Sequence, residues 1–210
     1  MSDRIKVFFL EPTDMERRWL RRYSKFEKER RCGNNANYFC NGMTLLYDCP
    51  EAQLWADYDK SNPQWPNNCD RCGVAFEADD EYQLFKRHLF KRQDTGELFT
   101  LADAPPGACW DASWMISDWN RDKRGSGYHV GPDGRCLVVK TPDGHDWMVD
   151  ARCSNCTLPD DDEHFCWVRH GRPEDGTLHV DKNGKTCSAG AGSIATGKWH
   201  GFLHNGYLHT

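Results

Sequence analysis

The cysteines constrain this chain most, because their number and spacing decide whether disulfide bonds or metal ions can organise its loops. Eleven cysteines occur in 210 residues, and an odd number leaves one thiol over under any complete disulfide pairing. The N-terminal residues lack the long apolar segment and cleavage site of an export signal, and no stretch approaches the roughly 18 to 20 apolar residues that span a membrane. We therefore expect reduced thiols and bound metal in a cytoplasmic protein that has no membrane partner.

The strongest local signal is a C-x2-C pair, Cys69 and Cys72, followed directly by glycine. This spacing is typical of a zinc knuckle, in which a tight turn aims two thiolates at one ion. Cys32 and Cys40 are the expected third and fourth ligands, and Cys49 is the substitute for either. Four thiolates would close the coordination sphere, so the predicted zinc is structural. Two alternatives remain open: a pair of reduced, half-buried thiols, or a thioredoxin-like redox pair, for which the flanking strand and helix are missing.

A second C-x2-C pair lies in the C-terminal half of the chain. With two later cysteines it could close a second zinc site, and the full set is Cys153, Cys156, Cys166 and Cys187. The third and fourth ligands are free choices at this spacing. The alternative is that these are reduced cysteines buried in a β core.

The first half of the chain favours helices. After a short predicted strand at residues 6–10, Thr13 and Glu16 have the capping-box pattern of a helix N-terminus. Residues 79–91 can form a second helix. The apolar side chains that follow the predicted cap recur at helical spacing and form one stripe: Trp19, Leu20, Tyr23 and Phe26.

Basic residues occupy much of the remaining surface of the first predicted helix. Residues 1–31 carry ten Lys or Arg against six Asp or Glu, whereas the whole chain has a net charge of −5. That overall charge argues against a general nucleic-acid coat, and a solvated basic face is the plainer interpretation. The candidate residues for contact with nucleic acid or an acidic protein surface are Arg17, Arg18, Arg21, Arg22 and Lys25.

The second half of the chain has the punctuation of β-hairpins. The predicted strand pairs are 136–140 with 145–149, 178–180 with 185–187, and 199–203 with 207–208, each joined by a turn that contains Asp-Gly or Asn-Gly. The segment 102–108, rich in Pro and Ala, is the best linker candidate. The expected fold is therefore α+β, with an N-terminal helical and zinc-organised region over residues 1–101 and a small antiparallel β module over residues 109–210.

Ser193 lies in a loop of small residues, and His200 follows seven residues later. A serine and a histidine can act as nucleophile and base, and glycine amides beside them can bind an oxyanion. Spacing alone is weak evidence, because no G-x-S-x-G elbow is present and the orienting acid could be Asp150, Asp175 or Asp181.

Four C-terminal segments form a recognisable set: Cys-Trp-Val-Arg-His-Gly at 166–171, Gly-Thr-Leu-His-Val at 176–180, Gly-Ser-Ile at 192–194 and His-Gly-Phe-Leu-His-Asn-Gly-Tyr-Leu at 200–208. They resemble a family of uncharacterised phage and prophage proteins. Segments 65–66, 104–112 and 154–161 are similar to longer phage-encoded proteins that carry this module. Some relatives occur in bacterial ubiquitin-like conjugation operons, where the module is regarded as a serine peptidase. The resemblance implies a phage or prophage origin, with Ser193 as nucleophile and His200 as base.

These observations favour a phage-encoded, zinc-stabilised protein without catalytic activity, a structural or interaction component such as an accessory piece of the virion. Most of its distinctive residues are glycines, prolines, aromatics and cysteines, which organise loops and surfaces. The runner-up is a serine hydrolase that acts on a ubiquitin-like or viral protein, and the third hypothesis is a nucleic-acid-binding zinc module. The expected partners are other phage or host proteins, and the expected location is the bacterial host cytoplasm or the virion.

Overall fold

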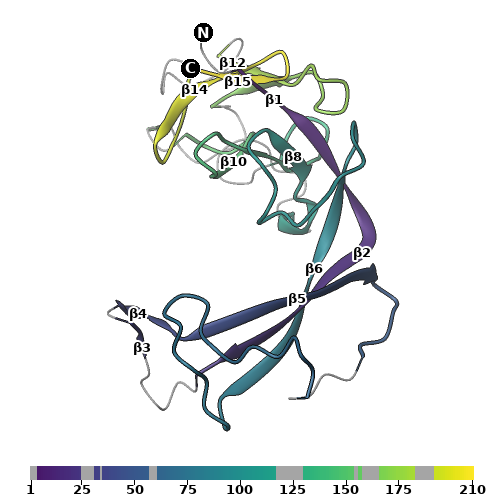
Figure 1. The fold of residues 1–210 in the computed structure, drawn as a ribbon. Coiled ribbons are helices and arrows are strands. Elements are labelled where there is room, and N and C mark those ends of the chain that lie inside the picture. The colour runs from purple at the N-terminus through teal and green to yellow at the C-terminus, as the bar shows by residue number, and fades with distance from the viewer. Residues whose placement is uncertain are drawn as a thin grey trace. The chain divides into compact units, whose positions relative to one another are not determined.

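The computed structural model describes residues 4–24, 31–33, 35–56, 61–116, 130–153, 156–157, 166–182 and 192–210. Within these ranges the chain is built from strands (Figure 1), and its helical structure is limited to one 3-10 turn, η2 (Ser113–Met115). The predicted α+β class is therefore wrong, and so is the predicted N-terminal helix.

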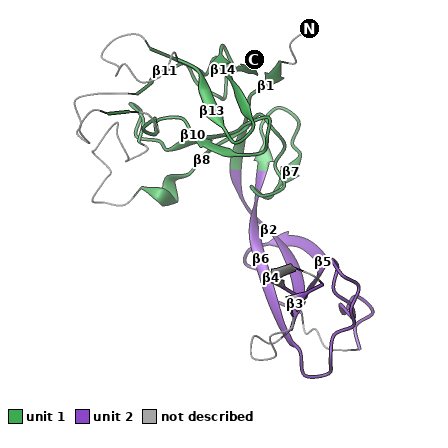
Figure 2. Ribbon diagram, turned by 90° about the vertical axis from the view of Figure 1, so that its left-hand side faces the viewer, with its two compact units in different colours: residues 1–11, 91–210 green, residues 12–90 purple. Residues whose placement is uncertain are grey.

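Contacts divide the chain into two compact units (Figure 2). Unit 1 comprises Met1–Glu11 and Lys91–Thr210, and unit 2 comprises Pro12–Phe90. Two long strands, β2 (Phe8–Tyr23) and β6 (Glu81–Arg92), contribute residues to both units.

The predicted linker at 102–108 falls inside unit 1. The amide of Gly107 donates to the carbonyl of Lys140 at 2.8 Å, and the carbonyl of Gly107 accepts from the amide of Phe8 at 3.0 Å. Gly107 has φ +91°, and a Cβ at this position would lie 2.4 Å from the carbonyl oxygen of Lys6. The segment therefore packs tightly against neighbouring strands of unit 1, and the predicted boundary between residues 101 and 109 differs from the division that the contacts give.

Unit 1 holds a four-stranded sheet, part of a larger sheet and a separate strand pair. The four-stranded sheet has the order β1 (Ile5–Lys6), β15 (Tyr207–His209), β14 (Trp199–His204), β13 (Ile194–Thr196). The larger sheet has the order β10 (Asp146–Met148), β9 (Leu137–Lys140), β8 (Ala108–Asp111), β2, β6, β7 (Leu98–Phe99), and β8 runs parallel to the start of β2. The separate pair is β11 (Val168–His170) with β12 (His179–Asp181).

Two of the predicted hairpins are confirmed. Strands β9 and β10 pair antiparallel across the turn at 141–144, and β14 pairs with β15 across Asn205 and Gly206. Both residues of the second turn have positive φ, +47° and +73°, which is the type I′ geometry that Asn-Gly favours. For the third hairpin, β12 pairs with β11, and residues 185–187 lie outside the described part of the chain.

The core of unit 1 is apolar. Trp199, Gly201 and Leu203 of β14 are buried and alternate with exposed residues, and Leu137 and Val139 of β9 are fully buried. The buried cluster consists of Val7, Cys109, Leu137, Val139, Val149, Leu178, Val180, Ile194, Trp199, Leu203 and Leu208. Burial of this apolar surface is the main force that stabilises unit 1.

Unit 2 is built on three strands in the order β5 (Asn41–Pro50), β2, β6, of which β5 and β2 are antiparallel. A short antiparallel pair, β3 (Arg31–Cys32) with β4 (Asn35–Phe39), lies in the same unit. Both helices predicted in this region are wrong. The segment expected to form a helix from Thr13 belongs to β2, and most of residues 79–91 belong to β6.

Burial in β2 explains the failure of the helical prediction. From Glu16 to Tyr23 burial alternates with a period of two, so that Glu16, Arg18, Leu20 and Arg22 are buried and the residues between them are half-buried. A strand points successive side chains to opposite sides of the sheet, and partners elsewhere in the chain override local helical preference.

Candidate metal centre

Four cysteine thiols of unit 2 converge on one point. The sulfur atoms of Cys32, Cys40, Cys69 and Cys72 all lie within 4.8 Å of one another. Cys32 and Cys69 have an Sγ–Sγ distance of 3.7 Å, as do Cys40 and Cys72. A disulfide bond requires about 2.05 Å, whereas a tetrahedral zinc with Zn–S bonds of about 2.3 Å separates its sulfurs by about 3.8 Å. The four cysteines could therefore hold one metal ion.

Backbone hydrogen bonds shape the turn that carries the C-x2-C pair. The amide of Cys69 donates to the carbonyl of Val74 at 2.8 Å, and the amide of Gly73 donates back to the carbonyl of Cys69 at 2.9 Å. Gly73 has φ +72°, a conformation that glycine adopts without steric cost. The amide of Asn41 also donates to Sγ of Cys69 at 3.4 Å. The glycine that marked the knuckle in the sequence is thus the residue that lets the turn close.

The other two thiols come from the ends of strands. Cys32 is the last residue of β3, and Cys40 lies between β4 and β5. Cys32, Cys40 and Cys69 are buried and pack with Phe76, whereas Cys72 is exposed. A buried thiolate needs a compensating positive charge, because an unpaired charge is costly to remove from water. A divalent cation bound by all four would supply that charge.

Burial and the neighbouring groups shift the pKa values of three thiols in the cluster in different directions. Burial, together with the neighbouring thiols Cys69 and Cys72, raises the pKa of Cys32 to about 11 and that of Cys40 to about 12. Burial acts in the same direction on Cys69, but backbone N–H groups of Cys72, Asn41 and Arg71 outweigh it and lower the pKa of Cys69 to about 6. Cys69 therefore ionises more readily than Cys32 or Cys40, and a cation at the centre would favour ionisation of those two thiols.

The substitute ligand and the second predicted site lie elsewhere. Cys49 is buried in β5 opposite Glu16, outside the cluster. Among the described residues no second group of three or more metal-ligating side chains comes together, so Cys153, Cys156 and Cys166 do not form one by themselves. Cys187 lies outside the described residues, and the second zinc site remains a prediction.

Ser193 and His200 are brought together in unit 1. Nε2 of His200 lies 2.8 Å from Oγ of Ser193. Ala195 of β13 pairs with His200 of β14, which makes Ser193 a diagonal neighbour of the histidine on the same side of the hairpin. No described residue hydrogen-bonds the other ring nitrogen of His200, so within the described chain the pair lacks an orienting third group.

The three acids considered as that third group have other partners. Asp175 accepts hydrogen bonds from the amide and hydroxyl of Thr177. The carboxylate of Asp181 lies 3.4 Å from Nε2 of His170 and 3.6 Å from Nε2 of His179. Asp150 belongs to a network of ion pairs in unit 1.

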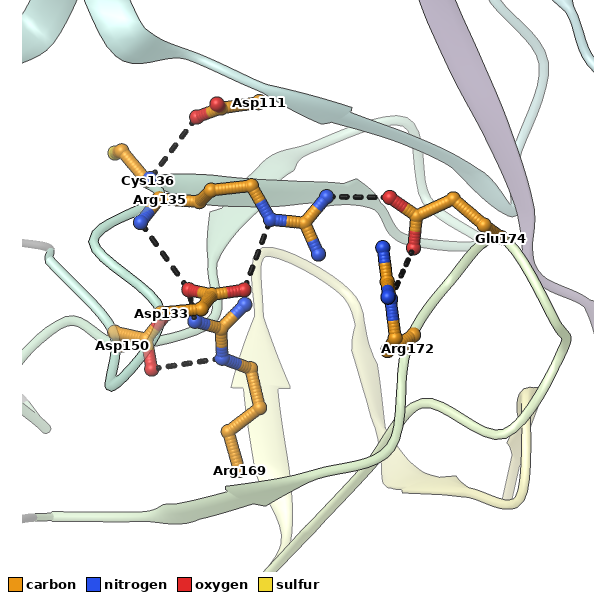
Figure 3. Close-up of polar contacts among 8 residues, drawn as sticks. All are labelled: Asp111, Asp133, Arg135, Cys136, Asp150, Arg169, Arg172 and Glu174. Atoms are coloured by element: carbon orange, nitrogen blue, oxygen red, sulfur yellow. Dashed lines mark hydrogen bonds and ion pairs between the residues drawn. The ribbon is translucent and has the colours of Figure 1, made fainter.

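Figure 3 shows this network, in which arginines alternate with carboxylates. Arg169 contacts Asp133 and lies 3.2 Å from Asp150, and Arg135 bridges Asp133 and Glu174. Burial raises the pKa of Asp150 to about 7, and the opposing attraction of Arg169 does not cancel this effect. The network joins the loop before β9, the end of β10 and the β11–β12 segment, so its evident role is to hold these segments together.

Two of the predicted basic contact residues, Arg18 and Arg22, are buried. Arg18 pairs with Glu16 at 2.6 Å and donates to the carbonyl of Leu54 at 3.1 Å, while Glu16 also pairs with Lys86 at 2.7 Å. Arg22 donates to the carbonyl of Pro66 at 3.2 Å. These side chains support the interior of unit 2. Hydropathy could not reveal them, because charged residues are normally exposed, and no local sequence signal distinguishes them from the neighbouring Arg17 and Arg21.

The remaining basic residues do not form the predicted helical face either. Arg17 makes two bonds to Asp48, at 2.8 and 2.9 Å, and Arg21 donates to the amide oxygen of Asn41. Both lie on the side of β2 opposite the buried row. Lys25 lies outside the described residues. The basic helix on which the nucleic-acid hypothesis rested is therefore absent, and Arg17 and Arg21 are half-buried residues of a strand.

Comparisons with known proteins give no relative from which the role of these sites could be inferred. No family model matches the chain, and no curated protein or solved structure matches it. In the part of the chain that the structure describes, no helix is long and apolar enough to cross a membrane.

Proposed function

We propose that this chain is a zinc-stabilised protein with a structural or interaction role, in which the four-cysteine centre organises unit 2. The observation that carries the proposal is the convergence of four sulfurs within 4.8 Å, two pairs of them at 3.7 Å. Zinc suits this donor set, because four thiolates in a tetrahedral arrangement form its usual structural site. Such a site is closed, whereas a catalytic zinc keeps a position for water or substrate.

Metal analysis of the purified full chain tests this proposal. We expect one zinc per chain from this centre, and we expect the double substitution Cys69→Ser with Cys72→Ser to lose that zinc. Cys49→Ser is the matched control, since Cys49 is a buried cysteine of the same unit outside the cluster. Cobalt substitution should give the spectrum of a tetrahedral thiolate complex. A native protein that is fully folded without metal would contradict the proposal.

A second double substitution tests whether the cysteines of the C-terminal half bind zinc. Cys153→Ser with Cys156→Ser removes the other C-x2-C pair. If the zinc content then falls by one per chain while the centre in unit 2 is retained, the second predicted site exists. An unchanged zinc content assigns these cysteines a role without metal.

The resemblance to phage proteins extends the proposal to an accessory virion component. Mass spectrometry of purified virions from a phage that encodes this chain tests that extension. Detection in the particle at fixed stoichiometry supports it, and absence from the particle contradicts it.

One observation favours a second candidate function, a serine hydrolase. It is the 2.8 Å contact between His200 Nε2 and Ser193 Oγ, which has the geometry of a nucleophile and its base. Labelling by a fluorophosphonate probe should then occur and should be lost in Ser193→Ala. Because neighbouring hairpin strands bring such side chains together without catalysis, equal labelling of the wild type and the variant would end this candidate.

A further inference from the structure

The sheet of unit 2 has one side covered by loops and one side that is only partly covered. On the covered side Arg18 and Arg22 donate to backbone carbonyls of residues 53, 54, 66 and 77. The opposite side carries the intervening residues of β2 and their neighbours on β5 and β6. We call this side the open face and define it by Trp19, Arg21, Met43, Leu45, Phe85 and Arg87.

Strand register and ring contacts place these six residues together. Trp19 pairs with Leu45 across the β2–β5 ladder, and Arg21 pairs with Met43. Directly opposite residues in a ladder share one side of the sheet. From β6, the ring of Phe85 stacks on that of Trp19 with centroids 5.3 Å apart and an interplanar angle of 7°.

The apolar part of the open face is unusually accessible. Met43 and Leu45 keep 40% and 50% of their surface exposed, although both lie in the middle of a strand. Trp19 and Phe85 are half-buried. Contiguous exposed apolar side chains on a sheet mark a surface that binds something.

The charge on the open face is positive at two points. The guanidinium of Arg21 lies 5.3 Å from the ring of Tyr23, and that of Arg87 lies 5.8 Å from the ring of Trp19. Among the described residues no carboxylate forms an ion pair with either group. The exposed guanidinium of Arg87 and the half-buried guanidinium of Arg21, which also donates to Asn41, therefore flank a pair of stacked aromatic rings.

We propose that the open face binds single-stranded nucleic acid, with bases stacked on Trp19 and Phe85 and phosphates contacted by Arg21 and Arg87. Aromatic rings accept any base by its π face, and guanidinium groups contact the phosphates that link successive bases. A duplex offers its phosphates but keeps the faces of its bases stacked inside, so the rings favour a single strand. This activity goes beyond the structural role proposed above.

Other occupants fit the open face less well. A second copy of the chain in a twofold interface would bring the same patch against itself, and the unneutralised arginines would then repel. A purely apolar partner would leave both guanidinium groups without a counter-charge where water is excluded. An acidic single strand with aromatic bases meets both requirements.

Fluorescence anisotropy with labelled single-stranded DNA and RNA of about 12 nucleotides tests the proposal on the zinc-loaded full chain. We expect Arg21→Gln with Arg87→Gln to weaken binding about ten-fold or more. The slope of the logarithm of the binding constant against the logarithm of the salt concentration should become shallower by about 1.4, because each phosphate contact on a single strand contributes about 0.7. Trp19→Leu keeps an apolar side chain without the ring. It should weaken binding about ten-fold with an unchanged slope.

Arg172→Gln with Lys198→Gln is the matched control, because it removes the same charge from exposed positions in unit 1. Zinc content and circular dichroism verify that each variant is folded. Four outcomes would overturn the proposal: no binding at low salt, equal loss in the control, equally tight binding of a duplex of the same length, or a dimer in sedimentation that Leu45→Lys dissolves.

Discussion

The two units of this molecule are stabilised by different kinds of interior. Unit 1 encloses a cluster of eleven buried residues, nearly all aliphatic or aromatic. In unit 2, the cluster around the metal centre contains three cysteines and one phenylalanine, and the buried row of β2 includes Glu16, Arg18 and Arg22. Apolar burial stabilises a fold by itself, whereas buried charges and thiolates stabilise it only while each keeps its partner. We infer that the stability of unit 2 depends on its metal and its buried ion pair more than the stability of unit 1 depends on its own ion-pair network.

Removal of the metal should produce the largest difference in stability between the two units. We expect a chelator to abolish amide protection around Asn41, Cys69 and Gly73, whose backbone bonds shape the centre. Structural zinc contributes apparent binding free energies of about 10 to 16 kcal/mol in isolated zinc-finger peptides. Hydrogen exchange read by mass spectrometry measures the effect, with β14 of unit 1 as the internal control. Equal loss of protection in both units would show that they do not differ in this way.

The buried ion pair gives the next largest expected effect. Arg18→Ala leaves Glu16 buried with Lys86 alone, and breaking a buried pair costs about 3 to 5 kcal/mol. Replacement of both partners, as in Glu16→Leu with Arg18→Met, should cost less than the single change, because no charge is then left unpaired. Urea unfolding measures both.

A cavity variant in unit 1 is the counterpart of that experiment. Leu203→Ala removes a fully buried side chain of β14 and should cost about 2 to 5 kcal/mol without any loss of zinc. If Arg18→Ala proves as mild as an exposed substitution, the interior of unit 2 does not depend on its charges.

These differences also explain which parts of the structure the sequence could predict. The hairpins of unit 1 were predictable because the Asp-Gly and Asn-Gly turns at 141–144 and 205–206 are local signals. The cysteine set was predictable because C-x2-C-G has one common structural use. Strand β2 was not, because its inward side chains include charges, and its hydrophobic pattern therefore suggested a helix.

The groups that make the extended conformation of β2 favourable are distant from it in the sequence. Arg18 donates to the carbonyl of Leu54 and Arg22 to that of Pro66, with sequence separations of 36 and 44 residues. No local propensity contains that information. The sequence identified Ser193 and His200 as a candidate pair, and they lie 2.8 Å apart, whereas the engagement of Asp150 with Arg169 depends on segments that meet only in the folded chain.

Asp150 gives unit 1 a pH dependence of its own. Burial raises the pKa of Asp150 to about 7, well above the usual value for an aspartate. The folded state therefore binds a proton more tightly than the unfolded state, so this group's contribution to stability falls as pH rises from about 4 towards 7 and is level above that. One pKa unit corresponds to about 1.4 kcal/mol.

The measurement is the difference in unfolding free energy between the wild type and Asp150→Asn. From pH 5 to pH 8 we expect the wild type to lose at least about 1 kcal/mol relative to the variant, which cannot ionise at this position. The difference cancels contributions from acids such as Asp133 and Glu174, whose pKa values are lowered and whose stabilisation is lost in acid instead. A pH-independent difference would mean that Asp150 is ionised throughout.

The smallest expected effect belongs to Thr13 in unit 2. Its hydroxyl donates to the carbonyl of Leu89 at 2.6 Å and accepts from the amide of Met15 at 3.1 Å, so it joins β2 to β6 and is not a helix cap. Thr13→Ala should cost about 1 kcal/mol, the usual net value of one hydrogen bond. Urea unfolding of the zinc-loaded chain measures this cost.

Two further substitutions separate the hydroxyl from the shape of the side chain. Thr13→Ser keeps the hydroxyl and loses the methyl group, whereas Thr13→Val keeps a branched side chain that suits a strand but cannot bond to Leu89. If the hydrogen bonds dominate, serine should be nearly neutral and valine should resemble alanine. If valine is neutral and serine is not, packing in the strand accounts for the effect and the bond to Leu89 contributes little. In either case the zinc content should stay unchanged, because Thr13 is not a residue of the metal centre.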